Sequence, residues 1–146
     1  MARTWQLTMY VRDAAPQMAF WCEVLGYVEE PPPEGFDTWP DALRAFGFPE
    51  DRITPDQAGA IIDPDGAGPR VFFHQVPEDK PDQMNRLHLD VQVSEPDDDD
   101  EARGAKQDAE VERLVALGAS VHGRVEDLGQ QWVVVRDPEG NEFCVT

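Results

Sequence analysis

The side chains best suited to metal binding or nucleophilic chemistry are few and lie far apart in the sequence. They are three histidines and two cysteines: His74, His88, His122, Cys22 and Cys144. Imidazole and thiolate are ligands that zinc prefers. A lone histidine on a half-buried strand, however, is more often a hydrogen-bonded wall residue, and a lone cysteine more often a small buried hydrophobe. His122 receives no role. The other residues gain meaning only if the fold brings them together, so the elements must be predicted first.

Motifs for several other chemistries are missing. The sequence has no glycine-rich phosphate loop after a strand, no Cys-x-x-Cys pair and no Gly-x-Ser-x-Gly elbow. Nucleotide-dependent, thiol-redox and serine-hydrolase activities therefore lack their physical prerequisites.

The charge balance excludes two classes of partner. The 146 residues carry 12 Lys+Arg against 30 Asp+Glu, a net charge of -18. Such a surface repels phosphate backbones and anionic lipids, so neither nucleic acid nor a membrane is expected as a partner. Two cysteines are too few for a disulfide scaffold, and no apolar run reaches the roughly 20 residues of a membrane span. With no visible signal peptide, the sequence predicts a cytoplasmic protein.

Periodicity predicts a strand and a helix in each half of the chain. Residues 5–13 and 87–93 alternate apolar and polar side chains, as half-buried strands do. Each is followed by an amphipathic helix, over 16–25 and 108–117, the first capped by Asp13 and ended by Gly26. Strands over 58–63 and 70–76 flank the turn 63–66, and strands over 131–136 and 141–145 flank the turn 137–140. One β-α-β-β-β pattern thus occurs twice.

Two insertions distinguish the halves. Residues 31–57 lengthen the first half, contain several aromatic side chains and are expected to pack as a flap around a short helix over 40–46. Residues 94–106 lengthen the second half and include a block of five acids at 97–101. A block of like charges resists compaction, so a disordered acidic loop is predicted there.

These features together resemble the vicinal oxygen chelate superfamily of glyoxalase I, bleomycin-resistance proteins and extradiol dioxygenases. The resemblance rests on the paired modules, on residues 19–27 (AFWCEVLGY), on 86–91 (RLHLDV) and on 137–143 (DPEGNEF). The long insertion and the ending NEFCV look most like the uncharacterised glyoxalase-like branch.

The resemblance implies the fold and the place of the site. It implies an α+β protein of two tandem β-α-β-β-β modules that form a cupped mixed sheet with the helices outside. One glyoxalase-like domain would span 1–146, with a first module over 1–80 and a second over 84–146. In that superfamily metal ligands come from the first and last strands of each module. By register these positions fall on Gln6, His74, His88 and Cys144.

This quartet leaves the role of a metal open. Two imidazoles and a thiolate suit zinc or another borderline ion, so a divalent metal (Zn, Ni, Mn or Fe) is one interpretation. The family's strong sites use His and Glu, whereas Gln6 offers a neutral amide and Cys144 a thiol. A metal-free cavity is therefore favoured. Asp90 and Glu142 are the acids nearest the expected site and are the candidate catalytic bases.

Two functions fit the same cavity. The favoured one is a protein that binds a small molecule, such as a drug or a metabolite, for resistance or sequestration. The alternative is a metal-dependent lyase, isomerase or dioxygenase acting on a substrate with vicinal oxygens. A homodimer is expected, because curved open sheets leave edges that a symmetric partner can cover. The predicted cavity residues are Gln6, Thr8, Phe72, His74, His88, Asp90, Trp132 and Cys144.

Overall fold

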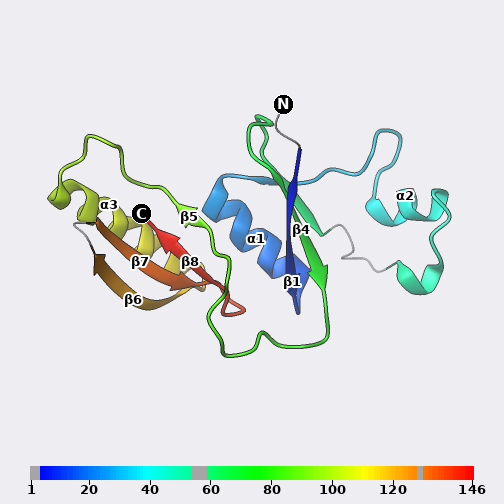
Figure 1. Ribbon diagram of the computed structural model, residues 1–146. Helices are drawn as coiled ribbons and strands as arrows, with labels where there is room; N and C mark the ends of the chain where they lie inside the picture. The colour runs from blue at the N-terminus through cyan, green and yellow to red at the C-terminus, as the bar shows by residue number, and fades with distance from the viewer. Residues whose placement is uncertain (1–3, 54–58, 128–129) are drawn as a thin grey trace. The chain divides into compact units, whose positions relative to one another are not determined.

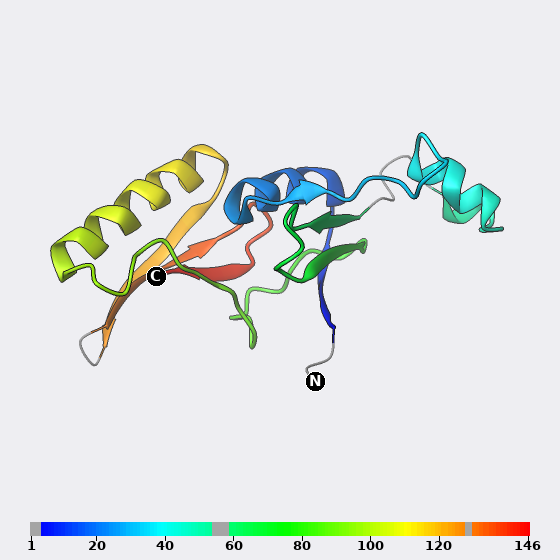
Figure 2. The ribbon, with the colours of Figure 1, turned by 90° about the horizontal axis from the view of Figure 1, so that it is seen from above.

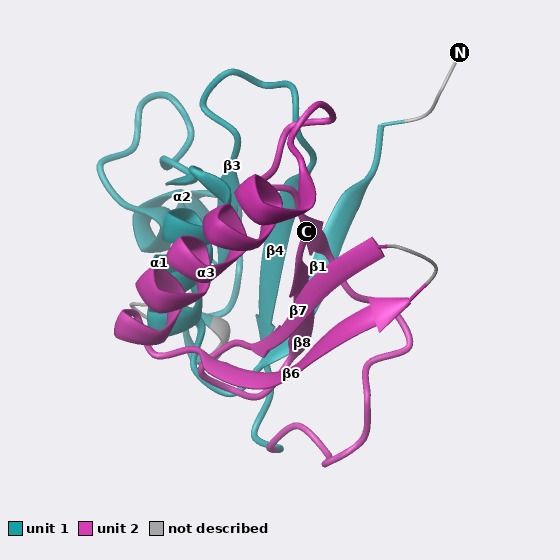
Figure 3. Ribbon diagram, turned by 90° about the vertical axis from the view of Figure 1, so that its left-hand side faces the viewer, with its two compact units in different colours: residues 1–78 teal, residues 79–146 magenta. Residues whose placement is uncertain are grey.

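The computed structural model describes residues 4–53, 59–127 and 130–146 and divides the chain into two compact units, Met1–Glu78 and Asp79–Thr146 (Figure 3). Each unit builds a four-stranded mixed sheet. No helix in the described part of the chain is long and apolar enough to cross a membrane.

Unit 1 contains the first β-α-β-β-β pattern (Figure 1). Its elements in chain order are β1 (Gln6–Val11), α1 (Ala14–Leu25), β2 (Val28–Glu29), α2 (Trp39–Ala45), the 3-10 turn Glu50–Arg52, β3 (Ala60–Ile62) and β4 (Arg70–Gln75). The sheet order is β1-β4-β3-β2, with β1 parallel to β4 and the other pairs antiparallel. Helix α1 packs on one face of this sheet (Figure 2), and its buried residues include Met18, Trp21 and Val24.

Unit 2 repeats the arrangement. Its elements are β5 (Asp90–Val91), α3 (Asp100–Ala116), β6 (Ser120–Asp127), β7 (Gln130–Arg136) and β8 (Glu142–Val145), in the sheet order β5-β8-β7-β6. Again the first and last strands pair in parallel, and the helix covers one face (Figure 2). Val133, Val135, Phe143 and Val145 are buried at 1% exposure or less. The predicted α+β fold with two tandem modules is confirmed.

Equivalent Asp-Pro-acid-Gly turns precede the last strand of each unit. The carboxylate of Asp63 accepts hydrogen bonds from the backbone N–H groups of Asp65, Ala67 and Gly68. These bonds lower the pKa of Asp63, against a smaller opposing effect of burial. The carboxylate of Asp137 is the equivalent acceptor in unit 2. It accepts hydrogen bonds from the backbone N–H groups of Glu139 and Asn141 and from the side-chain amide of Asn141. In each turn the first aspartate replaces the pairing that the backbone loses as it reverses.

The acidic segment 94–106 corrects a prediction. Helix α3 begins at Asp100 rather than at residue 108, so the latter part of the predicted disordered loop is helical. Asp99 caps the helix by accepting from the Ala102 N–H at 2.8 Å. Acids in a first helical turn face the positive end of the helix dipole, and Asp98 is neutralised by Lys106 at 2.6 Å. The prediction from like-charge repulsion was wrong because it considered neither the helix dipole nor the pairing of Asp98 with Lys106.

Several strand and helix predictions need smaller corrections. The strand predicted over 87–93 is reduced to Asp90–Val91, and Leu87 is 84% exposed instead of facing the core. Val115, predicted on the apolar stripe of α3, is 47% exposed, and the buried positions are Gln107, Val111 and Leu114. Asp13 occupies the N-cap position of α1, but its side chain makes no capping hydrogen bond. Gly26 ends α1 as predicted, with a left-handed φ of 68°.

The insertion in unit 1 contains the predicted short helix. Thr38 caps α2 by accepting from the Asp41 N–H at 3.3 Å. The Trp39 indole donates to the Glu30 carbonyl at 2.9 Å, and Phe36 packs edge-on against Phe46. Residues 54–58 lie outside the described residues, so the start of the predicted strand over 58–63 is not described.

Replacing Asp137 by Ala is expected to lower the free energy of unfolding by about 1–3 kcal/mol, because part-buried N–H donors lose a charged acceptor. Chemical denaturation would measure the change. Asp65→Ala is the control, since Asp65 is an exposed side chain in the equivalent turn, and it should change stability by less than about 0.5 kcal/mol. Equal effects of the two variants would contradict this account of the turn.

Candidate functional site

The clearest cluster of chemically versatile side chains lies in unit 2. His88, Asp90 and Cys144 offer ligand atoms that all lie within 4.8 Å of one another. The parallel pairing of β5 with β8 places Asp90 directly opposite Cys144, and His88 lies two residues before Asp90 on the same face. His88 Nε2 lies 3.3 Å from Asp90 Oδ1. Sequence alternation predicts His88 and Asp90 on one face of their strand, and the family resemblance adds Cys144 to the site. In unit 2 the structure brings these three residues together.

The three members of this cluster differ in exposure. The side chains of His88 and Asp90 are 47% and 59% exposed, whereas Cys144 is 6% exposed. Burial raises the pKa of the Cys144 thiol to about 11, with further contributions from the charge of Asp90 and from a hydrogen bond to its carboxylate. At neutral pH Cys144 is therefore a neutral thiol that donates to Asp90. The group is not a thiolate nucleophile, because only the thiolate attacks.

The donor set of this cluster matches a borderline divalent ion. Imidazole nitrogen, carboxylate oxygen and sulfur are all zinc ligands, and three of them complete a site with one open position. His88, Asp90 and Cys144 would hold such an ion, which would displace the thiol proton. Among the residues that the structure describes, no other group of three His, Cys, Asp or Glu side chains has ligand atoms this close together.

Unit 1 carries the other two residues of the predicted quartet. β1 and β4 pair so that Gln6 lies beside Arg70, Thr8 beside Phe72 and Tyr10 beside His74. Gln6 Oε1 accepts from Arg70 Nη1 at 3.0 Å, and its amide nitrogen lies 3.4 Å from the Thr8 hydroxyl. The oxygen with which Gln6 could bind a metal is thus occupied by a guanidinium.

Aromatic groups gather on the same face of unit 1. The rings of Tyr10 and His74 lie 5.1 Å apart, and those of Phe72 and His74 lie 6.2 Å apart. Arg70 lies over Phe72 at 5.4 Å and also forms an ion pair with Glu30. Tyr10 and Arg70 were not among the predicted site residues, although each lies on the same face of its strand as residues that were predicted. Applying the same alternation to every residue of β1 and β4 would have included them.

Trp132 belongs to the face of unit 2 that carries Cys144. Val134 is the partner of Cys144 across β7 and β8, and Trp132 lies two residues before it on the same face. Its side chain is half-buried. Unit 2 therefore presents an aromatic ring on the same face as its polar cluster.

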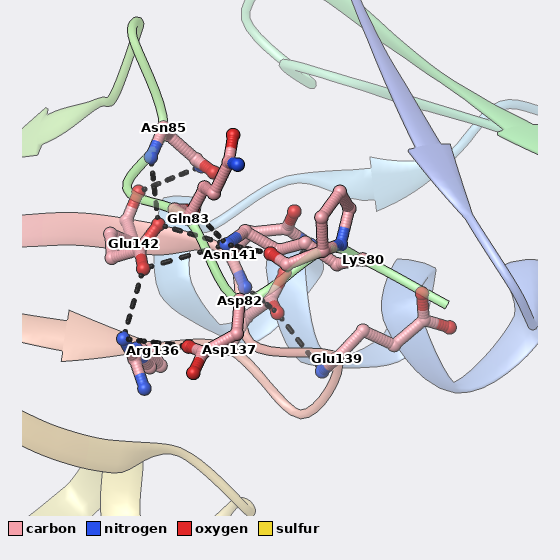
Figure 4. Close-up of polar contacts among 10 residues, drawn as sticks. Lys80, Asp82, Gln83, Asn85, Arg136, Asp137, Glu139, Asn141 and Glu142 are labelled. Carbon is pink, nitrogen blue, oxygen red and sulfur yellow. Dashed lines mark hydrogen bonds and ion pairs between the residues drawn. The ribbon is translucent and has the colours of Figure 1, made fainter. Parts of the chain in front are cut away.

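Glu142, one of the two candidate bases, is engaged in a buried ionic network (Figure 4). It is 5% exposed, and its carboxylate contacts Lys80 Nζ at 3.3 Å, Arg136 Nη2 at 3.2 Å and the Asn85 N–H at 3.0 Å. Burial raises the pKa of Glu142, but the Asn85 and Lys80 hydrogen bonds outweigh it and the pKa is lowered. A general base needs a pKa near neutrality, so this geometry fits an anchor of the segment before β5.

Cys144 allows a direct test of its electrostatic environment. Replacing Asp90 by Asn is expected to lower the Cys144 pKa from about 11 while leaving it above the ordinary thiol value of 9.0, because burial is the largest cause and persists. Thiolate absorbance followed against pH, in a Cys22→Ala background, would measure it. Asp97→Asn removes the same charge from an exposed position and should leave the pKa unchanged. An unshifted pKa in Asp90→Asn would refute the proposed contact.

Glu142 gives a second test. Glu142→Gln is expected to lower the free energy of unfolding by about 3–5 kcal/mol, since it removes one partner from a buried ion pair. Asp82→Asn provides the control, because Asp82 lies 3.9 Å from the same Arg136 but is 98% exposed, and a surface pair contributes less than about 1 kcal/mol. Similar losses of unfolding free energy in both variants, measured by chemical denaturation, would contradict the role of Glu142 as an anchor of the segment before β5.

Three solved structures illustrate what the fold resembles. The fosfomycin resistance protein FosX of Listeria monocytogenes, in complex with Mn(II) and sulfate, is 14% identical with a TM-score of 0.61, covering 99% of this chain and 89% of that one. A glyoxalase/bleomycin resistance protein/dioxygenase family enzyme of Burkholderia phytofirmans PsJN is 16% identical with a TM-score of 0.59, covering 96% and 94%. A lactoylglutathione lyase of Agrobacterium tumefaciens is 17% identical with a TM-score of 0.54, covering 99% and 91%.

Similarity at these identities establishes a shared fold alone. No curated protein matches the sequence significantly. The model of the family described as "Glyoxalase-like domain" matches residues 6–146, which is nearly the whole chain. The chain therefore belongs to the glyoxalase-like domain family.

Proposed function

We propose that this protein binds a small molecule on the strand face of unit 2 that α3 leaves uncovered, without a permanently bound metal, and so sequesters a drug or a metabolite. The observation that carries the proposal is the cluster of His88, Asp90 and Cys144, in which one buried thiol lies beside two half-exposed polar side chains. Such a cluster can orient a ligand by hydrogen bonds to the imidazole and the carboxylate.

The charge and the aromatic side chains indicate the class of ligand. With a net charge of -18, the protein attracts cations at long range. Trp132 in unit 2, and Tyr10 and Phe72 in unit 1, offer rings on which a planar cation can stack. An aromatic cation therefore fits this protein better than an anionic substrate.

The metal-free version of the proposal rests on Gln6. Its carbonyl oxygen accepts from Arg70, and a cationic side chain at that distance disfavours a second cation on the same atom. Gln6, one of the four predicted metal ligands, is therefore a poor metal ligand in the observed side-chain arrangement.

A metal-dependent lyase, isomerase or dioxygenase is the second candidate. It is favoured by the close approach of the three donor atoms in unit 2. A divalent ion bound there would polarise two adjacent oxygens of a substrate. In that case Asp90 would be a ligand, and the engagement of Glu142 with Lys80 and Arg136 would leave the base to be supplied by another group.

We also propose that the protein is a cytoplasmic homodimer. Both cysteines are free thiols, which suits a reducing compartment. Within the sheets of their own units β1 and β5 are edge strands, and an edge offers unpaired backbone groups to a partner.

Binding of the planar cation proflavine tests the proposed function. In wild-type protein at low salt, calorimetry should detect binding that weakens as salt is added, because screening reduces the attraction. His88→Ala is expected to weaken it about tenfold, the loss of one hydrogen bond to a charged cluster. His122→Ala is the matched control, as His122 is an exposed histidine on β6 of the same unit.

Elemental analysis of untagged protein, purified without chelator, separates the two candidate functions. The proposal expects no stoichiometric metal in wild type or in His88→Ala. A metal at one ion per chain that disappears in His88→Ala but stays in His122→Ala would replace the proposal by the metal-dependent candidate. Absence of proflavine binding at both low and high salt would remove the charge argument.

A further inference from the structure

A pocket outside the polar cluster lies at one end of unit 2, where β5 and β8 end and α3 begins. It has a volume of about 510 Å³. Pockets for drug-sized ligands span roughly 300–1,000 Å³, so this one can hold a substantial chemical group. Its neutral polar lining is made of the amides of Gln92, Gln130 and Gln131 and the hydroxyls of Ser94 and Thr146, and Glu95 and Arg103 add one charged group of each sign.

Part of the pocket lining continues the face that carries the polar cluster, whereas Arg103 and Gln131 line it from the side that α3 covers. Gln92 lies two residues beyond Asp90, and Thr146 two residues beyond Cys144, so each shares the face of the earlier residue. The parallel ladder extends this far, since the N–H of Thr146 donates to Val91 at 3.0 Å and that of Val93 to Thr146 at 2.8 Å. Two residues of strand correspond to roughly 6.5–7 Å. One ligand can therefore reach both the cluster and the pocket.

The side chains of the pocket are mostly neutral and free to bind. Within the described residues, the side chains of Gln92, Ser94 and Gln130 form no hydrogen bond. Gln131 is held in place, because its amide donates to the Asp100 carbonyl at 2.9 Å. Amides donate and accept, and so do hydroxyls, which suits a partner that also does both.

The charged groups of the pocket argue against an anion. Arg103 is already paired with Asp100 at 3.2 Å and donates to the Asp98 carbonyl at 3.1 Å. Glu95 adds a negative charge to the lining. A phosphate or carboxylate would meet a compensated guanidinium within a strongly acidic protein, so its binding is disfavoured.

We infer that this pocket binds the neutral, hydroxyl-rich part of the ligand, a group of the sugar type. Trp132 does not line the pocket but lies two residues from the lining residue Gln130 on the same face of β7, so an amphipathic ring follows the pocket along this strand. The inference rests on the proposed function, in that the adjoining cluster holds the remainder of the same small molecule.

Methyl β-D-glucopyranoside is the probe for the pocket. Saturation-transfer NMR should detect weak binding to wild-type protein, since each hydroxyl exchanges one hydrogen bond with water for one with protein. Gln92→Leu and Gln130→Leu keep the approximate size of the side chain and remove its polar atoms, and each is expected to weaken binding about tenfold. Gln75→Leu is the matched control, an exposed glutamine of unit 1 whose replacement should leave binding unchanged. Inorganic phosphate should not compete.

The outcomes separate this inference from the proposed function. Glucoside binding that is absent, unaffected by both pocket variants, or abolished by phosphate overturns the inference, even where proflavine still binds. Proflavine that fails to bind overturns the proposed function, and glucoside binding that still requires Gln92 and Gln130 then supports the pocket on its own. Circular dichroism of each leucine variant shows whether the fold is intact, and either variant suffices for the test.

Discussion

The parallel pairing of β5 with β8 is the interaction on which the candidate site depends. It consists of few hydrogen bonds: Cys144 N–H to Leu89 at 2.8 Å, Thr146 N–H to Val91 at 3.0 Å and Val93 N–H to Thr146 at 2.8 Å. These bonds fix Asp90 opposite Cys144. β8 itself is buried along its whole length, whereas β5 is an edge strand. The position of Asp90 therefore depends on what holds the segment before it, and Glu142 holds that segment through Lys80 and the Asn85 N–H. A buried charge at the start of β8 thus supports the geometry of the exposed groups at the neighbouring strand β5.

Acidic side chains outnumber basic ones in this chain, and the basic side chains near the sites form ion pairs with nearby acids. Each basic side chain that bears on the sites is paired within its own unit: Arg70 with Glu30, Arg136 with Glu142, and Arg103 with Asp100. Pairing converts single charges into neutral groups that still donate hydrogen bonds. The uncovered strand faces consequently offer neutral donors and aromatic rings against an acidic background, which favours neutral or cationic ligands over anionic ones.

The sequence predicted the repeat, the helix α1 and both Asp-Pro-acid-Gly turns, because each depends on local periodicity or turn chemistry. It mispredicted the acidic segment, where capping by Asp99 and pairing of Asp98 with Lys106 turn a repulsive block into a helix start. Alternation also placed His88 and Asp90 on the polar side of their strand, whereas Cys144 was assigned to the site through the family resemblance. It could not predict that Asp90 contacts Cys144, because strand register between segments far apart in the chain is set by tertiary pairing. The contacts of Lys80 and Asn85 with Glu142 were not predicted for a related reason, because both residues lie in a segment without periodicity.

The state of the Cys144 proton distinguishes metal binding from metal-free binding in physical terms. A divalent ion at His88, Asp90 and Cys144 would require the thiolate, and a thiol whose pKa is about 11 costs about 5 kcal/mol to deprotonate at pH 7. An ion must first overcome that cost, and its affinity would rise steeply as the pH increases. A small molecule that accepts the existing arrangement, with its neutral thiol, meets no such cost, so the thiol adds no pH dependence to its affinity near pH 7. The burial that makes Cys144 a poor nucleophile thus also disfavours metal binding. It favours metal-free binding, in which the cluster acts as a fixed set of hydrogen-bonding groups.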